Sequence, residues 1–173
     1  MRVNRRIQAW IEPEKDQEAC RFDKRLPLGY FFHNDGQVIY GHATIPGVGP
    51  AGIKFGDFNS VHNPTELLDA DKVTEFTPEE VEAFRKETET LIPASKGKVI
   101  HHRKCFFTNT PDGHFILDRL PNHKRVVVGC GFSGHGFKFM PTMGQVLADL
   151  TIDGKTKWDV DFLSLKRFQR AKL

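Results

Sequence analysis

A cysteine and a lysine that could take part in chemistry lie at the two ends of one stretch of the sequence. Cys105 opens a polar segment that runs to His114, and Lys138 closes a glycine-rich segment that begins at Gly131. A cysteine offers a nucleophilic sulfur, and glycines let the backbone approach a flat ligand closely. A lysine beside them adds a point charge suited to a carboxylate. Together, these residue types are typical of a cofactor site.

Each of these residues also has a structural interpretation. The cation of Lys104 would lower the pKa of the neighbouring Cys105 thiol, but a cysteine beside two phenylalanines is also typical of a packed interior. Lys138 would otherwise be a surface residue at a helix start, a place that the helix dipole disfavours for a cation. Lys54 lies within the apolar residues 52–56, so its ammonium either extends to solvent or points into a polar cavity.

Composition and charge limit the class of protein. The 173 residues are 39% hydrophobic and 27% charged, which suits one domain with a core, or one domain and part of another. The net charge of +3 is too small and too scattered to indicate nucleic-acid binding. No apolar run approaches the roughly 18 residues of a membrane span, and the N-terminus lacks the apolar core of a secretion signal.

The cysteines and histidines predict neither disulfides nor a metal site. Three cysteines are too few for a disulfide framework and favour a reducing compartment. The histidines show no His-x-x-x-His spacing, and no Cys-x-x-Cys accompanies them. We therefore expect no zinc site.

Alternating and apolar runs predict a series of short strands. Two of them flank the turn Asn34-Asp35-Gly36, and Asp-Gly is typical of a hairpin because it suits positive φ angles. The expected strands are residues 5–12, 28–33, 37–40, 52–58, 98–108, 114–118 and 125–129.

Two helices are expected among these strands. Thr77 and Glu80 form a capping box, with a proline at the first helical position. The helix that follows places Val81, Phe84, Thr88 and Leu91 on one face and stops near residue 93. A second helix over residues 142–150 would bury Met143, Val146, Leu147 and Leu150.

The predicted fold class is α+β. A mostly antiparallel sheet with one covering helix comes first, and a strand, a glycine loop and a helix follow it. Val126, Val127 and Val128 form a fully apolar run. Such a run suits a central strand that is buried on both faces.

Two blocks of sequence resemble the monomeric sarcosine oxidase family, which includes N-methyltryptophan oxidase and the peroxisomal sarcosine and pipecolate oxidases. The blocks are residues 105–118 (CFFTNTPDGHFILD) and 131–139 (GFSGHGFKF), and they have the family's separation. Residues 162–168 are similar to the family's closing segment, and residues 38–41 and 52–56 fall in the family's order. The resemblance covers nearly the whole chain.

The resemblance implies flavin chemistry. These enzymes carry FAD attached through a cysteine sulfur, which corresponds to Cys105. Lys138 corresponds to the lysine that binds the substrate carboxylate, and Lys54 to the lysine that activates dioxygen. The loop beside the flavin ring corresponds to Gly134, His135, Gly136 and Phe137. The implied reaction oxidises an N-methyl amino acid to an imine, with dioxygen as the second substrate and hydrogen peroxide as a product.

The resemblance is incomplete near the substrate amine. Family members often carry a histidine and an aromatic residue there, whereas around Phe58 and Ile39 this chain has neither in the family's positions. Tyr40 supplies the aromatic residue if the register shifts by one. The substrate preference within the family is therefore left open.

The resemblance also implies a division of the chain. Residues 1–122 would belong to the substrate-binding domain, and residues 123–173 would be the last strand and helix of the FAD-binding domain. The family begins with a dinucleotide-binding unit that bears Gly-x-Gly-x-x-Gly and with an arginine that partners the carboxylate-binding lysine, and neither is present here. We expect a fragment that needs a separate FAD-binding half.

Other interpretations of the chain remain open. A non-catalytic domain that binds another chain would keep Lys54 and Lys138 as relics, and a small carboxylate-binding module would use them without flavin. The last residues, Ala171-Lys172-Leu173, are a variant of the peroxisomal Ser-Lys-Leu address. In a eukaryote this predicts a peroxisomal protein, and otherwise we expect a cytoplasmic one.

Overall fold

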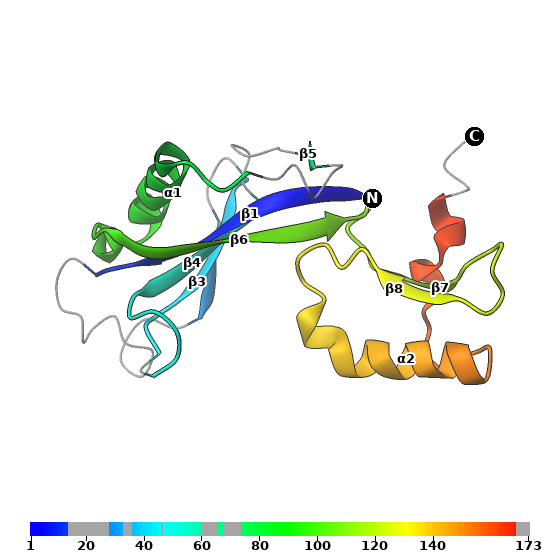
Figure 1. Ribbon diagram of the computed structural model, residues 1–173. Helices are drawn as coiled ribbons and strands as arrows, with labels where there is room; N and C mark the ends of the chain where they lie inside the picture. Colours follow the sequence, from blue (N-terminus) through cyan, green and yellow to red (C-terminus); the bar gives the residue numbers. More distant parts are fainter. Residues whose placement is uncertain (14–27, 33–35, 46, 60–65, 68–73, 169–173) are drawn as a thin grey trace. The chain divides into compact units, whose positions relative to one another are not determined.

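The computed structural model describes residues 1–13, 28–32, 36–45, 47–59, 66–67 and 74–168. The chain forms two compact units (Figure 1). The sheet unit is Asn4–Phe106, and the hairpin unit is Met1–Val3 together with Phe107–Leu173. Each unit has its own hydrophobic core.

The sheet unit is built on a six-stranded sheet with the order β2-β3-β4-β1-β5, in which β6 also pairs with β1. The pairs β2–β3, β3–β4 and β4–β1 are antiparallel. The strands are β1 (Arg2–Ile11), β2 (Gly29–Phe32), β3 (Val38–His42), β4 (Ile53–Asn59), β5 (Glu66–Leu67) and β6 (Val99–Asn109).

One face of this sheet packs on the helix α1 (Pro78–Leu91) (Figure 1). Side chains of a strand alternate between the two faces, so Ile7, Ala9 and Ile11 of β1 point together toward this core. Phe55 of β4 and Phe84 of α1 join them in the same cluster. The other face of the sheet is therefore free to carry polar and aromatic groups.

The start of α1 confirms the expected capping box. Thr77 accepts a hydrogen bond from the Glu80 backbone N–H, and the Glu80 carboxylate accepts one from the Thr77 backbone N–H. Phe84 and Thr88 are buried, and Val81 and Leu91 are partly buried on the expected face. A short 3-10 helix, η2 (Pro93–Ser95), follows.

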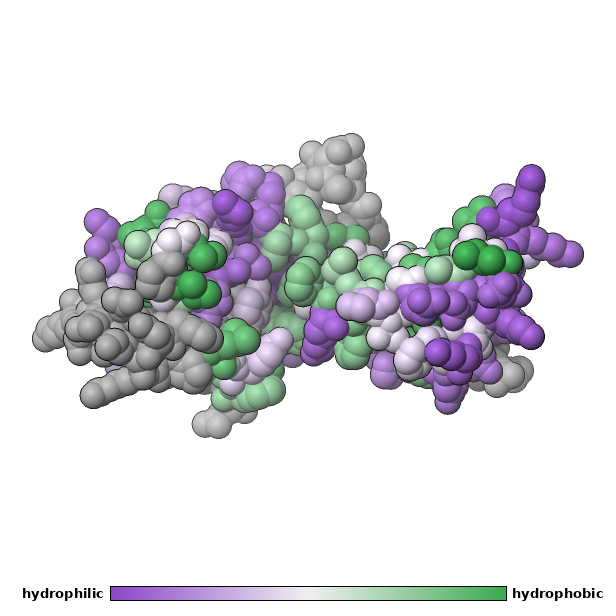
Figure 2. All heavy atoms as spheres, turned by 90° about the horizontal axis from the view of Figure 1, so that it is seen from below, coloured by the Kyte–Doolittle hydropathy of each residue, from purple (hydrophilic) through white to green (hydrophobic). Residues whose placement is uncertain are grey.

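The hairpin unit consists of a two-stranded antiparallel sheet and a helix that packs on it. The elements are β7 (Ile116–Arg119), β8 (Val127–Cys130), η3 (Phe137–Phe139), α2 (Met140–Ile152), η4 (Asp161–Leu163) and η5 (Leu165–Phe168). Its core combines Phe115 and Leu117 with Met143 and Val146 of α2 and with Leu163. Hydrophobic residues also lie on its surface among hydrophilic ones (Figure 2).

A mixed α and β fold with a mostly antiparallel sheet is confirmed. The residues of the expected hairpin turn, Asn34 and Asp35, lie outside the described residues, but β2 and β3 do pair as expected. Val126 is 42% exposed and β8 is half-buried, so the expected strand buried on both faces is not observed. The reason is that β8 pairs only with β7 within the described part of the chain. The assignment of residues 1–122 and 123–173 to two functional domains stays a prediction.

Candidate functional site

Two rows of residues cross the face of the sheet opposite the core. In the first row Tyr40 of β3 pairs with Gly56 of β4, which pairs with Gln8 of β1. The two ends of this row are linked by a hydrogen bond of 2.7 Å, in which the Gln8 side-chain amide donates to the Tyr40 hydroxyl. The tyrosine thus reaches across a whole strand.

Gly56 makes this reach possible because it has no side chain. A Cβ at this position would lie 2.1 Å from Cζ of Tyr40 and 2.3 Å from its hydroxyl oxygen. The Tyr40 ring therefore lies against the backbone of β4. Burial raises the pKa of the Tyr40 hydroxyl to about 12, although the bond from Gln8 acts in the opposite direction. This hydroxyl stays neutral and can act as a hydrogen-bond donor at neutral pH.

The second row places Lys54 against an aromatic ring. Lys54 of β4 lies between His42 of β3 and Trp10 of β1 in the strand register. Its Nζ is 5.1 Å from the Trp10 ring centroid, a cation–π distance. Burial lowers the pKa of Lys54, Cys105 acts against this, and Arg103 adds to it. The lysine is thus half-buried over a ring rather than extended into solvent.

Cys105 shares the environment of these two rows. It is a half-buried free thiol, and its thiolate form would interact electrostatically with both Lys54 and Tyr40. Burial is the largest effect and raises the pKa of the thiol, as does Asp57, while Arg6 and Lys54 lower it. The structure therefore brings three of the expected site residues, Cys105, Lys54 and Tyr40, into one neighbourhood.

The expectation that Lys104 lowers the pKa of Cys105 is wrong. Successive residues of a strand point to opposite faces, and the Lys104 ammonium forms an ion pair of 2.5 Å with Glu75. The cations that do act on the thiol are Arg6 and Lys54, from other strands. The net effect of its surroundings keeps the thiol protonated at neutral pH.

Ile39 and Phe58, where the resemblance is incomplete, occupy different environments in the sheet unit. Ile39 is 1% exposed and belongs to the core, so it does not face the site. Tyr40 comes next in the strand and faces the opposite side. The Phe58 ring packs edge-on against Tyr30, at 5.9 Å between centroids. Of the pair Ile39 and Tyr40, only Tyr40 is placed to meet a ligand.

The glycine loop of the hairpin unit has a backbone that depends on its glycines. Gly131 and Gly134 have φ angles of 66° and 79°, values that residues with a Cβ rarely adopt. A Cβ on Gly134 would also lie 2.3 Å from the Phe107 ring. Within the loop, the Ser133 N–H donates to the Thr108 carbonyl at 3.0 Å. Packing inside the unit thus accounts for part of the glycine pattern.

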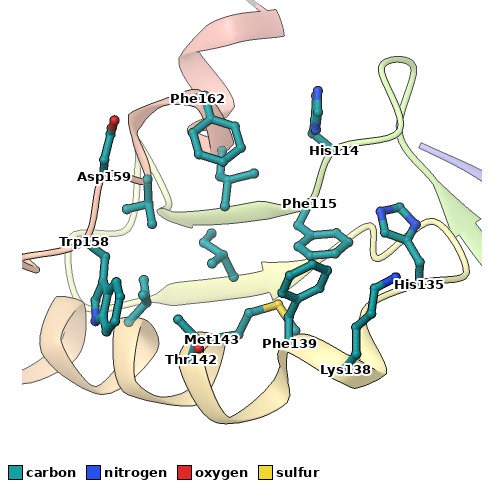
Figure 3. Close-up of a pocket in the computed structure, with 14 residues that line it drawn as sticks. His114, Phe115, His135, Lys138, Phe139, Thr142, Met143, Trp158, Asp159 and Phe162 are labelled. Atoms are coloured by element: carbon teal, nitrogen blue, oxygen red, sulfur yellow. The ribbon is translucent and has the colours of Figure 1, made fainter.

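A cavity of about 360 Å³ lies beside this loop. Its lining is mostly apolar and includes Leu117 of β7, Met143 and Val146 of α2, and Leu163. Figure 3 shows Phe115 and Phe139 in its middle, Trp158 and Asp159 at one end, and Lys138 and His135 at the other. Two of the expected site residues, Lys138 and His135, therefore border a cavity that the sequence did not predict.

The remaining loop residues do not line this cavity. Phe137 is 86% exposed. Gly134 and Gly136 allow the loop backbone to pack closely against the Phe107 and Phe132 side chains. The His135 Nδ1 lies 2.9 Å from the Ser133 carbonyl oxygen, so it carries the proton of that bond. The Nε2 atom is then the nitrogen that is free to meet a ligand when the ring is neutral.

The described residues contain no group of three or more His, Cys, Asp and Glu side chains that could hold a metal ion. No helix among them has the length and apolar character needed to cross a membrane.

The sequence matches the model of the FAD dependent oxidoreductase family over residues 3–150. This match covers most of the chain. The chain belongs to the FAD-dependent oxidoreductase family.

Relatives within the FAD-dependent oxidoreductase family include amine oxidases. Monomeric sarcosine oxidase of Bacillus sp. (strain NS-129) is 37% identical over 133 residues, which are 75% of this chain and 33% of that protein. Peroxisomal sarcosine oxidase of Homo sapiens is 45% identical over 64 residues, 37% of this chain and 16% of that protein. N-methyl-L-tryptophan oxidase of Salmonella enteritidis PT4 (strain P125109) is 39% identical over 74 residues, 43% of this chain and 20% of that protein.

A solved structure has the same fold. L-proline dehydrogenase from P. horikoshii superposes with a TM-score of 0.70 at 24% identity, over 100% of this chain and 42% of that one. The chain thus spans less than half the length of the relatives and of this structure.

Proposed function

We propose that this chain is the C-terminal part of an oxidase that acts on the CH–NH group of N-methyl amino acids. The amine would be oxidised to an imine, and dioxygen would be reduced to hydrogen peroxide. FAD, when bound, supplies the electron acceptor for this oxidation. The observation that supports the proposal most is the grouping of Cys105, Lys54 and Tyr40 on one face of the sheet.

The residues on this face fit a flavin. Cys105 is a free thiol, which a covalent bond to the cofactor requires. Because Gly56 has no Cβ, which would overlap the Tyr40 ring, this ring lies flat on β4. The sheet face is therefore flat enough there to accept a planar group. Cys105 would hold FAD through its sulfur. The loop residues Gly134, His135, Gly136 and Phe137 would lie beside the ring system.

Lys54 is suited to stabilise negative charge on dioxygen. Its charge is fixed over the Trp10 ring at 5.1 Å, and the charged groups that shift its pKa are Cys105 and Arg103 rather than a carboxylate. A cation held in a partly buried place stabilises a developing anion more strongly than one in water. Lys54 would therefore promote the oxygen reaction.

Lys138 and Tyr40 would hold the amino acid. Lys138 is exposed at the end of the glycine loop, where its ammonium can pair with the substrate carboxylate. The neutral Tyr40 hydroxyl can donate a hydrogen bond to the substrate.

A second polypeptide segment, the dinucleotide-binding half, would complete the site. The strand β8 pairs with β7, and Val126 beside it is 42% exposed. Within the described residues β8 pairs with no strand other than β7, and such an apolar edge is suited to pair with a further strand. In this proposal residues 123–173 belong to the FAD-binding domain and residues 1–122 to the substrate-binding domain.

The place of action would be the peroxisome in a eukaryotic source, and otherwise the cytoplasm. The motif Ala171-Lys172-Leu173 is a variant of the peroxisomal address and lies outside the described residues. It acts as an address only where Leu173 is the free C-terminus. A fluorescent protein fused before residues 164–173 tests this: it should enter peroxisomes, and Leu173→Asp should leave it in the cytosol.

The flavin proposal is tested by reconstitution. The chain is co-expressed with the dinucleotide-binding half of a relative, and the purified complex is examined for visible flavin absorbance. After acid denaturation, the flavin should stay on this chain and should map to the peptide that contains Cys105. Cys105→Ser should release all flavin on denaturation, whereas Cys130→Ser, the matched control, should retain it. A colourless complex would instead favour a non-catalytic domain.

A further inference from the structure

A buried ion pair lies in the sheet unit, close to the thiol of Cys105. The Arg6 guanidinium of β1 donates a hydrogen bond of 3.1 Å to the Asp57 carboxylate of β4. The two residues are only 6% and 2% exposed, so solvent screens their charges little. Burying such a pair adds little stability, because the cost of desolvation offsets the attraction. Packing alone therefore gives little reason for these two charges, whereas a role at the neighbouring thiol gives one.

The strands β1 and β6 bring this ion pair next to the thiol. They pair with each other and run in opposite directions (Figure 1). The Trp10 ring of β1 and the His101 ring of β6 lie 5.1 Å apart between centroids. Alternate residues of a strand share a face, so four residues along each strand from this contact lead to Arg6 on β1 and to Cys105 on β6. The guanidinium therefore lies beside the sulfur, across the strand pair.

The two charges of the ion pair act on the thiol in opposite directions. Burial raises the pKa of Cys105 most, Asp57 raises it further, and Arg6 lowers it. A cation beside a sulfur favours the thiolate, and an anion favours the thiol. The other titratable or charged groups on this face are Lys54 of β4, Tyr40 of β3 and Arg103 of β6. Of the charges on β1 and β4, the ion pair thus supplies one of each sign.

We propose that Arg6 and Asp57 are positioning residues that set how readily the Cys105 sulfur gives up its proton. The Arg6 guanidinium stabilises the thiolate, and Asp57 holds the guanidinium in place while opposing the same negative charge. This inference rests on the proposed function in one respect, namely that the sulfur bonds FAD. When that bond forms, the thiol proton and one hydrogen of the flavin carbon are lost, and the two electrons released reduce dioxygen to hydrogen peroxide. The ion pair acts on the loss of the thiol proton.

Alkylation of the thiol tests this inference on the chain alone, without flavin. Iodoacetamide reacts with the thiolate: a sulfur–carbon bond forms and iodide leaves. The rate at Cys105 is followed by the mass of its peptide over a range of pH from neutral to alkaline. Cys130 is a second free thiol, in the hairpin unit, and neither Arg6 nor Asp57 shifts its pKa. Its rate in the same sample therefore reports whether a variant has opened the fold.

Variants of the two charges should change the rate in opposite directions. Arg6→Gln should slow alkylation of Cys105 and Asp57→Asn should accelerate it, each by about three- to tenfold, because a more basic thiolate is less abundant but more nucleophilic. Arg6→Lys keeps the charge and should react like the wild type. Lys104→Gln is the matched control. Lys104 is the neighbour of Cys105 in the sequence, but its ammonium pairs with Glu75, so this variant should leave the rate unchanged.

A double variant separates the effect of charge from the effect of packing. Removing one partner of a buried ion pair can loosen the fold, whereas Arg6→Gln/Asp57→Asn leaves neither charge behind. Its Cys105 rate should return to within about twofold of the wild type, because the two opposite effects cancel. A rate as far from the wild type as in a single variant would overturn the inference. Single variants that shift the rate in the same direction, or an equal shift in Lys104→Gln, would also overturn it.

The reconstituted complex separates this inference from the flavin proposal. Arg6→Gln should slow the appearance of flavin bound covalently to this chain, and Arg6→Lys should not. Opposite alkylation shifts in the two single variants, together with a colourless complex, would contradict the flavin proposal alone. Covalent attachment at the wild-type rate in Arg6→Gln, together with unchanged alkylation of Cys105, would overturn this inference and leave the flavin proposal standing.

Discussion

Replacing Gly56 by alanine tests whether the site face must be flat where Tyr40 crosses β4. The new Cβ would lie 2.1 Å from Tyr40 Cζ. The ring must then move by about 1.4 Å to reach the roughly 3.5 Å of an unstrained carbon–carbon contact. That movement breaks the 2.7 Å bond from Gln8. The change should therefore lift the tyrosine off the sheet.

The size of the effect follows from two contributions. Forcing an extra carbon into a packed place costs about 1–3 kcal/mol, and losing a hydrogen bond costs about 0.5–1.5 kcal/mol. We expect Gly56→Ala to lower the free energy of unfolding by about 2–4 kcal/mol, which a domain with about 5–15 kcal/mol survives. Gly144→Ala in α2 is the control. Nothing lies within 4 Å of a Cβ there, so it should stabilise the helix by about 0.5–1 kcal/mol.

The assay follows the Tyr40 hydroxyl itself. The chain has two tyrosines, so a Tyr30→Phe background leaves only Tyr40 to titrate. Tyrosinate absorbance, read within milliseconds of a pH jump before unfolding, should give a pKa of about 12 without the glycine change. In Gly56→Ala the pKa should fall toward the ordinary value of 10.0, because the ring is no longer buried. An unchanged pKa together with unchanged stability would refute this account of the site face.

Three other predictions concern stability. Gly134→Ala adds a Cβ 2.3 Å from the Phe107 ring at a φ of 79°, so denaturant unfolding should show a loss of about 2–4 kcal/mol. The Arg167 guanidinium lowers the pKa of Asp112. The Arg167–Asp112 ion pair should add at most about 1 kcal/mol to the free energy of unfolding, as an exposed pair does. This contribution should be present above pH 4 and lost at lower pH, and Asp112→Asn should remove this pH dependence of the stability. Because the folded pKa of Tyr40 is raised from 10.0 to about 12, the wild type should lose about 1–2 kcal/mol between these pH values, and Tyr40→Phe should not.

Matched variants and pH ranges make these three predictions specific. Gly113→Ala has a positive φ of 73° but no atom within 4 Å, so it should cost only about 1 kcal/mol. An equal cost at Gly134 would show that Phe107 does not restrict the loop. A wild type and an Asp112→Asn variant with parallel acid unfolding curves would contradict the role of that ion pair. If the wild type and Tyr40→Phe lost equal free energies of unfolding at alkaline pH, this would contradict the burial of the Tyr40 hydroxyl.

Local signals predicted the elements well. The helix α1 (Pro78–Leu91) follows from Thr77 and Glu80, because a capping box acts through residues three positions apart. The strand β3 follows from the hairpin-turn signal at residues 34–36, and β4 is predicted as a further short strand over residues 52–58. Such signals depend on neighbours in the sequence, and the structure confirms them with boundaries that differ by a few residues.

Long-range features could not be predicted in this way. Trp10 contacts Lys54 because β1 and β4 pair in one particular register, which alternation within each strand does not determine. The cavity exists because the segment that carries Trp158 folds back and its continuation bonds to Asp118 of β7. Arg6 and Asp57 reach Cys105 from other strands.

Anaerobic reduction of the flavin tests the central claim most directly. The chain is combined with FAD and the dinucleotide-binding half of a relative, and an N-methyl amino acid is added in the absence of oxygen. The account predicts that the visible flavin absorbance bleaches, that it returns when oxygen is admitted, and that hydrogen peroxide forms in equal amount. Lys138→Gln should raise the substrate concentration needed for bleaching. A bound flavin that no N-methyl amino acid reduces would contradict the claim that this chain is part of an amine oxidase.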